Sequence, residues 1–194
     1  MYAYLDGKLA FKSPGMVHLD VNGVGYEVYI SLNTYSDIQH LEKVKLYIHF
    51  QVKEDSNTLF GFFGLREKEI FQYLISVSGV GAATARMMLS SLKPEEVANA
   101  IAQGNTKVLE NVKGIGKKSA ERLILELRDK VGKQTASGSE NVLNGNTMAA
   151  DALTALTSLG IARTQAELAI KKTMGNNNSF TNLEDLIKQA LKAI

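Results

Sequence analysis

The sequence has 194 residues, of which 45% are hydrophobic and 22% are charged, and its formal net charge is +2. It contains no cysteine, which excludes disulfides, thiolate nucleophiles and cysteine-ligated metals. No apolar run reaches the roughly 18 residues of a membrane-spanning helix, and the first residues lack a signal-peptide pattern. We therefore expect a folded cytoplasmic protein that does not act at a membrane.

Residues 1–64 have the pattern of a small β-domain. Residues 16–21 and 26–30 alternate in polarity on either side of an Asn22-Gly23 turn, which is typical of a hairpin. A second pair of strands is predicted at residues 44–52 and 58–65, joined by a polar turn that contains Glu54 and Asp55. About five short strands with glycine-marked turns favour a barrel, and an OB-fold is the first choice.

Residues 65–133 change to a helical period. Ile70, Phe71, Leu74 and Ile75 form one apolar stripe. Pro94 and Gly104 bracket a second helix, and another is expected from about Lys117 to Lys130.

Positive charge is concentrated in this middle segment. It carries 12 lysines and arginines against 8 aspartates and glutamates, compared with 5 against 7 in residues 1–64 and 5 against 5 in residues 134–194. Phosphates of a bound nucleic acid would be neutralised here. The excess alone is weak evidence, because most surface lysines are simply solvated.

The C-terminal third divides into a linker and a mini-domain. Residues 134–146 have linker composition and no regular period. Residues 147–194 predict three short helices. The spacings Thr164-x-x-Glu167 and Thr181-x-x-Glu184 predict capping boxes at two of the helix starts.

The middle segment repeats itself at an offset of 35 residues, so that Gly79-Val80-Gly81 aligns with Gly114-Ile115-Gly116. Each unit is an apolar helix end, a glycine turn and a helix that begins with small residues. Glycines allow a tight turn and let a ligand approach the backbone closely. The turn would direct N–H groups at an anion near the start of the second helix. A nucleic-acid phosphate is the obvious anion, and this contact does not depend on base sequence.

Basic residues follow the second turn. Lys117 and Lys118 come directly after it, and Arg122 lies one helical turn beyond Lys118. The alternative is that each Gly-x-Gly merely caps a helix. Two copies at this spacing, one of them followed by Lys-Lys, favour phosphate binding.

At these positions the chain resembles the RuvA family of Holliday-junction-binding proteins. Residues 112–123, Val-Lys-Gly-Ile-Gly-Lys-Lys-Ser-Ala-Glu-Arg-Leu, are similar to the second helix-hairpin-helix motif of that family. Ala82-Ala83 stand where many members have Pro-Lys, so we expect the first hairpin to depend more on its backbone N–H groups and on Arg86.

The resemblance covers the whole chain and implies an α+β protein. An OB-fold domain (1–64) would be followed by a tandem helix-hairpin-helix domain (65–133), the linker (134–146) and a UBA-like three-helix domain (147–194). The residues expected to bind DNA phosphates are Gly79, Val80, Gly81, Arg86, Gly114, Ile115, Gly116, Lys117, Lys118 and Arg122.

Residues 52–62 resemble the acidic-pin hairpin of the same family. Taken alone, this turn would be expected simply to be solvated. The resemblance implies instead that Glu54 and Asp55 of four subunits gather where four DNA arms meet. One carboxylate about 7 Å from a phosphate is unfavourable by roughly 2 kcal/mol at an effective dielectric near 20. Unstacking a base-pair step costs about 1.4 kcal/mol, so the pin would hold the crossover open by repulsion.

The resemblance also implies the partners. A homotetramer, or an octamer of two tetramers, would hold a four-way junction open and square during recombination, repair and the SOS response to DNA damage. It would recruit the RuvB ATPase for branch migration, and the RuvC resolvase would be a further partner. Leu156, Leu159 and Ile161 are the expected docking residues, although many members have tyrosine where Ile161 stands, and Leu156 alone would suit the domain's core.

No catalytic machinery is evident. The second glycine turn superficially resembles a P-loop, but that motif needs glycine where Asn111 stands. The three histidines form no ligand pattern. We therefore expect a protein that is not an enzyme and needs no cofactor or metal. Two alternatives stay open: a helix-hairpin-helix base-excision glycosylase, for which Asp129 is the nearest candidate acid, and a general DNA-binding adaptor.

Overall fold

The computed structural model describes residues 1–135, 147–176, 180 and 182–194. The chain divides into two compact units: unit one is Met1–Gly138 and unit two is Ser139–Ile194. Most of the linker predicted at 134–146 lies outside the described residues. Within the described ranges, no helix has both the length and the apolar character needed to cross a bilayer.

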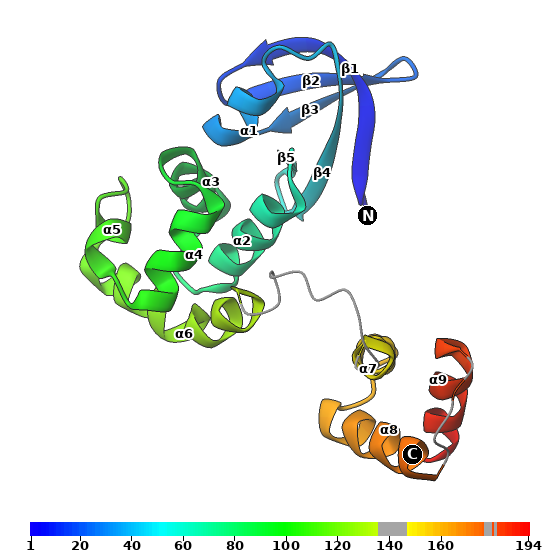
Figure 1. The fold of residues 1–194 in the computed structure, drawn as a ribbon. Helices are drawn as coiled ribbons and strands as arrows, with labels where there is room; N and C mark the ends of the chain where they lie inside the picture. The colour runs from blue at the N-terminus through cyan, green and yellow to red at the C-terminus, as the bar shows by residue number, and fades with distance from the viewer. Residues whose placement is uncertain (136–146, 177–179, 181) are drawn as a thin grey trace. The chain divides into compact units, whose positions relative to one another are not determined.

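The first part of unit one is a closed five-stranded barrel (Figure 1). Its strands are β1 (Tyr4–Ser13), β2 (Met16–Val21), β3 (Val24–Tyr29), β4 (Lys43–Val52) and β5 (Asn57–Phe62), in the order β1-β2-β3-β5-β4. All neighbours are antiparallel except β3 and β5, and β1 closes the barrel by pairing with β4. Val44, Leu46 and Ile48 alternate inward along β4 and are at most 5% exposed. The predicted barrel is confirmed.

A short helix, α1 (Leu32–Ile38), connects β3 to β4 and was not predicted. Ser31 is its N-cap, and its side chain accepts a hydrogen bond from the N–H of Thr34. Only Thr34 and Ile38 of its seven residues are buried, so the segment has no apolar stripe that a sequence pattern could show.

Five helices complete unit one: α2 (Leu65–Ser76), α3 (Ala82–Ser91), α4 (Pro94–Gln103), α5 (Thr106–Glu110) and α6 (Lys117–Thr135). Pro94 and Gly104 bracket α4 as predicted, and Gly104 ends it with φ of +70°. The helical core also includes Phe60 and Phe62 of β5. Because these two side chains belong to the core of the helices, the barrel and the helices form one compact unit.

Unit two contains the three predicted helices, α7 (Thr147–Ser158), α8 (Arg163–Asn176) and α9 (Leu183–Lys192). The predicted capping box at Thr164 is wrong, because α8 begins one residue earlier and Glu167 pairs with Arg163 instead. For α9 the N-cap is Asn182, whose side chain accepts from the N–H of Asp185. Thr181, the residue expected there, lies outside the described residues.

A buried carboxylate lies where the barrel meets the helices. Glu67 of α2 is 5% exposed and accepts hydrogen bonds from the hydroxyls of Ser31 and Thr34. Burial raises the pKa of Glu67 above its ordinary value of 4.5; the two hydroxyls oppose this shift, while the charges of Asp37 and Glu95 add to it. The folded protein therefore disfavours the ionised form of Glu67, and ionisation of this carboxyl lowers the stability of the fold.

We predict that wild type loses stability relative to Glu67→Gln as the pH rises above about 4.5, the ordinary pKa of a glutamate side chain. The unfolded chain releases this proton at a lower pH than the folded chain, so between the two pKa values ionisation favours unfolding. Urea unfolding of both proteins from pH 4.5 to 8 measures the difference in free energy. A difference that moved in favour of wild type with increasing pH would contradict the prediction.

Candidate nucleic-acid interface

The two glycine turns have the same backbone geometry. Gly79 and Gly114 have φ of +91° and +93°, values that residues other than glycine rarely adopt. In the first turn the N–H of Val80 donates to the carbonyl of Val77 at 3.0 Å, and in the second the N–H of Ile115 donates to Val112 at 3.0 Å. The sequence repeat is therefore a structural repeat: α2 and α3 flank one turn, and α5 and α6 flank the other.

The aliphatic residue between each pair of glycines anchors its turn. Val80 and Ile115 are 5% and 6% exposed and belong to the helical core. Their side chains and their N–H groups are thus both used within the chain. Val80 and Ile115 thus anchor the two turns in the core, and the flanking glycines form the outer surface of each turn.

The outer surface of both turns is open. In the described part of the chain, a Cβ added at Gly79, Gly81 or Gly116 would meet nothing within 4 Å outside its immediate neighbours. Gly81 is the N-cap of α3 with φ of −83°, and no side chain caps that helix. Since neither strain nor crowding requires glycine at 81, the open space is room for a ligand to reach the first N–H groups of α3.

The two hairpins adjoin each other. A Cβ at Gly114 would lie 4.0 Å from Cγ2 of Thr84, in the first turn of α3. The second turn therefore lies beside the start of the helix that follows the first turn. Two helix N-termini with equivalent turns can act together on one polyanion.

Basic side chains surround the second turn. Lys117 and Lys118 are exposed at the start of α6. Arg122 is also exposed, but its Nε lies 2.7 Å from Oε1 of Glu126, which offsets part of its charge. Lys113 is exposed just before Gly114. The sequence analysis did not name it as a basic residue of the site, although its position next to the repeated glycine turn could have indicated this.

The side chain of Arg86 contacts the barrel. Its NH1 donates to the carbonyl of Gly15 at 2.9 Å, and its guanidinium carbon lies 5.2 Å from the centre of the Tyr29 ring. This arginine therefore joins α3 to the barrel, and the phosphate contact expected of it stays a prediction.

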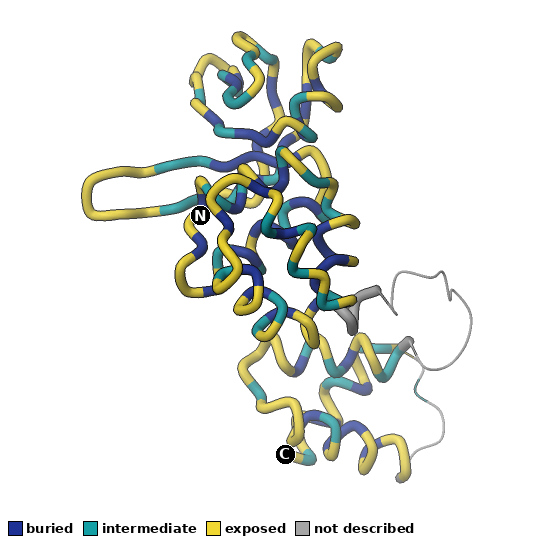
Figure 2. Tube along the Cα trace, turned by 90° about the vertical axis from the view of Figure 1, so that its left-hand side faces the viewer, coloured by how far each residue is buried: buried dark blue, intermediate teal, exposed yellow. Residues whose placement is uncertain are grey.

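The acidic turn is the exposed tip of the β4–β5 hairpin, which extends away from the rest of unit one in Figure 2. Residues 52–57 are all exposed. The N–H of Lys53 donates to the carbonyl of Ser56 at 2.8 Å and closes the turn. Glu54 and Asp55 thus lie together at the end of a projecting two-stranded arm.

The three expected docking residues of unit two differ in how far they are buried. Leu156 is fully buried in its core, Ile161 packs against that core, and Leu159 is 64% exposed. Leu168 of α8 is 68% exposed and was not predicted, because a leucine within a helix normally indicates a core position. Among the described residues of unit two, the exposed leucines are therefore 159, 168 and 191, and Leu191 is the least exposed of them at 43%.

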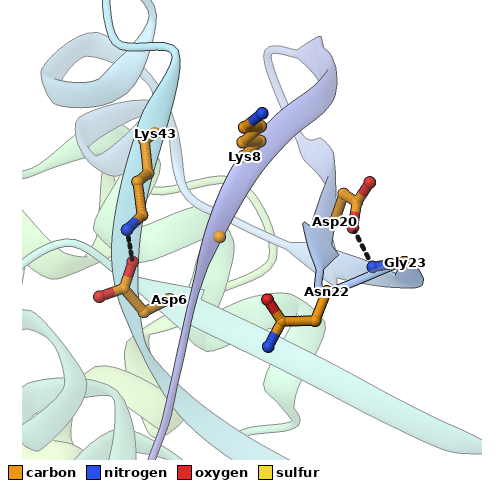
Figure 3. Close-up of a pocket in the computed structure, with 7 residues that line it drawn as sticks. Asp6, Lys8, Asp20, Asn22, Gly23 and Lys43 are labelled. Carbon is orange, nitrogen blue, oxygen red and sulfur yellow. Dashed lines mark hydrogen bonds and ion pairs between the residues drawn. The ribbon is translucent and has the colours of Figure 1, made fainter.

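A polar hollow on the barrel is lined by charged residues, which include an ion pair and a carboxylate hydrogen-bonded to the backbone. Asp6, Lys8, Asp20 and Lys43 surround a hollow of about 360 Å³ on the barrel (Figure 3). Lys43 pairs with Asp6 at 3.4 Å, and Asp20 accepts from the N–H of Gly23 at 2.7 Å. Among the described residues, no group of three or more histidine, aspartate or glutamate side chains could hold a metal ion.

Comparisons with known proteins agree with this architecture. Family models match residues 1–61 (RuvA N terminal domain), 71–129 (SAM-like helix-hairpin-helix tandem) and 147–194 (RuvA, C-terminal domain). The Holliday junction branch migration complex subunit RuvA of Cytophaga hutchinsonii is 49% identical, with 99% of each chain covered. The proteins of the same name from Christiangramia forsetii and Geobacter sulfurreducens are 48% and 45% identical, each covering at least 99% of both chains.

We predict that substitution destabilises the protein at Gly114, where φ is positive, and has little effect at Gly81. Gly114→Ala should cost about 1–2 kcal/mol because alanine is strained at positive φ. Gly81→Ser should change stability by only a few tenths of a kcal/mol, since serine is a good N-cap. Urea unfolding midpoints measure both. Equal losses would show that Gly81 is needed for the fold itself.

Proposed function

The chain belongs to the RuvA family, and we propose that it is the non-catalytic subunit of a branch migration complex and binds Holliday junctions by their structure. The observation that carries the proposal is the pair of open glycine turns. They offer backbone N–H groups at two adjoining helix starts, with Lys117 and Lys118 beside one of them. Phosphates are the common feature of every DNA arm, so contacts of this kind do not depend on base sequence.

In this proposal each turn holds one backbone phosphate. Gly79, Gly81, Gly114 and Gly116 provide the close approach, while Val80 and Ile115 hold the turns in shape from the core. Lys117, Lys118 and Lys113 add positive charge, and Arg122 contributes less because Glu126 neutralises part of it. Each phosphate neutralised should add about 0.9 to the slope of log K against log salt.

The acidic hairpin would act by repulsion. Glu54 and Asp55 stand on an arm whose tip is exposed on all sides. With four subunits around one crossover, their carboxylates would oppose the collapse of the arms onto one another. The pin would lower the affinity slightly and favour the open, square form of the junction, so that the hairpins must provide the binding energy.

The assembly would be a homotetramer, or two tetramers that enclose the junction. Unit two would recruit the RuvB ATPase, which supplies the energy for branch migration, and the RuvC resolvase would act on the same junction. Leu159 would contact the ATPase directly, and Leu156 would support it from the core. The complex would work in the cytoplasm, whose reducing conditions suit a chain without cysteine.

We predict that the protein binds a four-way junction at least about 100-fold more tightly than linear duplex at the same salt, because linked sites on several arms act together. Gel-shift titration of both DNAs, with the mass of the complex measured, tests this. Equal affinities would refute structure-specific binding.

Two double variants test the glycine turns and the acidic hairpin separately. Gly81→Ser with Gly116→Ser should weaken binding to both DNAs, because the serine oxygens compete for the helix N–H groups. Glu54→Gln with Asp55→Asn should bind the junction at least as tightly as wild type and open it less. Fluorescence of 2-aminopurine beside the crossover reports the opening. A general adaptor would show no effect of the pin variant.

For the motor partner, Leu159→Asp should reduce binding of the ATPase by about tenfold or more, since a buried charge at an interface costs over 1.4 kcal/mol. Pull-down of the ATPase by the full chain measures it. Thr154→Asp, at an exposed position of the same unit, is the matched control. Equal binding by both variants would move the docking surface away from Leu159.

A further inference from the structure

The contact between the barrel and the helices is polar and directional. Nδ2 of Asn33, at the start of α1, donates to the carbonyls of Leu89 and Leu92 at 2.6 and 2.9 Å. These carbonyls lie at the end of α3. Arg86, earlier on α3, donates to Gly15 in the turn between β1 and β2. One helix of the first hairpin is thus tied to the barrel at two separate places.

Glu67 joins three segments at the same contact. Its two carboxylate oxygens accept from the hydroxyls of Ser31 and Thr34. The hydroxyl oxygen of Thr34 also accepts from the N–H of Phe63, at 3.2 Å. The start of α1, the end of β5 and the first turn of α2 therefore meet at one carboxylate. No buried side-chain nitrogen or oxygen in the described residues lacks a hydrogen-bond partner.

In the sequence, Glu67 also lies midway between the two parts that would touch DNA. It is twelve positions from Asp55 at the tip of the β4–β5 hairpin and twelve positions from Gly79 in the first turn. The connecting elements are β5 on one side and α2 on the other. Any rotation between barrel and helices at this point would swing the acidic tip relative to the glycine turns.

A buried carboxylate is a costly way to make a contact stable. Apolar side chains of similar volume often serve stability equally well or better. Hydrogen bonds provide something that apolar contacts lack, namely a fixed direction between the groups they join. The geometry of the cluster is therefore better explained by orientation than by stability.

We propose that Glu67 is a positioning residue: with Ser31 and Thr34 it fixes the angle between the acidic pin and the phosphate-binding turns, and this fixed angle distinguishes a four-way junction from a linear duplex. The inference rests on the proposed function. Duplex needs only the turns, which Val80 and Ile115 both anchor in the one helical core, whereas a junction must satisfy turns and pin together.

The first measurement concerns the angle itself and needs no DNA. The chain has no cysteine, so Lys8→Cys on β1 and Gln103→Cys on α4 place two spin labels at exposed sites on either side of the contact. Pulsed electron resonance should give a narrow distance distribution in the otherwise wild-type chain. Glu67→Gln should broaden or shift it. The control is Glu95→Gln, which changes an exposed carboxylate in the hollow that Glu67 also lines, where α1, α2 and α4 meet; it should leave the distribution unchanged.

The second measurement concerns specificity. Glu67→Gln should keep duplex affinity within about twofold and reduce the preference for the junction by about tenfold, the effect of losing one charge-assisted hydrogen bond. Glu95→Gln should match wild type in both. Loss of folding alone would weaken the binding of both DNAs together, and unfolding midpoints would reveal it.

Thr34 supplies a test that keeps the carboxylate. Thr34→Val removes the hydroxyl at nearly constant volume and should reproduce the effect of Glu67→Gln, whereas Thr34→Ser keeps the hydroxyl and should behave as wild type. If wild type itself shows no junction preference, the proposed function fails. If wild type prefers the junction while Glu67→Gln and Thr34→Val keep both the preference and the narrow distance distribution, the positioning role is overturned.

Discussion

The position of one aliphatic side chain between two glycines is the constraint on which the proposed DNA-binding face depends. Val80 and Ile115 are buried in a common core, and each closes its turn through its own N–H. The glycines on both sides are thereby held at the surface, and the first N–H groups of α3 remain uncapped by any side chain. A site preorganised in this way loses little conformational entropy on binding. Because it consists of backbone, it suits a ligand recognised by phosphate alone.

The local parts of this arrangement could be predicted from the sequence, because they depend on neighbouring residues. The 35-residue repeat located both turns, Pro94 and Gly104 located α4, and polarity alternation located the barrel strands. The same reasoning could not assign what each residue does in three dimensions. It placed Val80 and Ile115 at the turns correctly, but only the structure shows that their side chains face the core.

The parts that could not be predicted involve residues far apart in the chain. Arg86 pairs with Gly15 across 71 positions, and Glu67 with Ser31 across 36. No periodicity reports partners so far apart in the chain, so neither contact could be predicted from the sequence. The leucines of unit two show the converse: Leu156 and Leu159 look alike in sequence, yet one is fully buried and the other is exposed.

The proposed pin works only if its distance from the DNA is controlled. At an effective dielectric near 20, the repulsion between a carboxylate and a phosphate falls from about 2.4 kcal/mol at 7 Å to about 1.4 kcal/mol at 12 Å, even before salt screening. The second value equals the mean stacking energy of about 1.4 kcal/mol per base-pair step. A displacement of roughly 5 Å would therefore remove the advantage of repulsion over stacking. The tip lies at the end of a long hairpin, where a small rotation at the hairpin's base produces a large displacement. A rigid contact at that base is thus a requirement of the mechanism, and the hydrogen bonds around Glu67 lie where such a contact is needed.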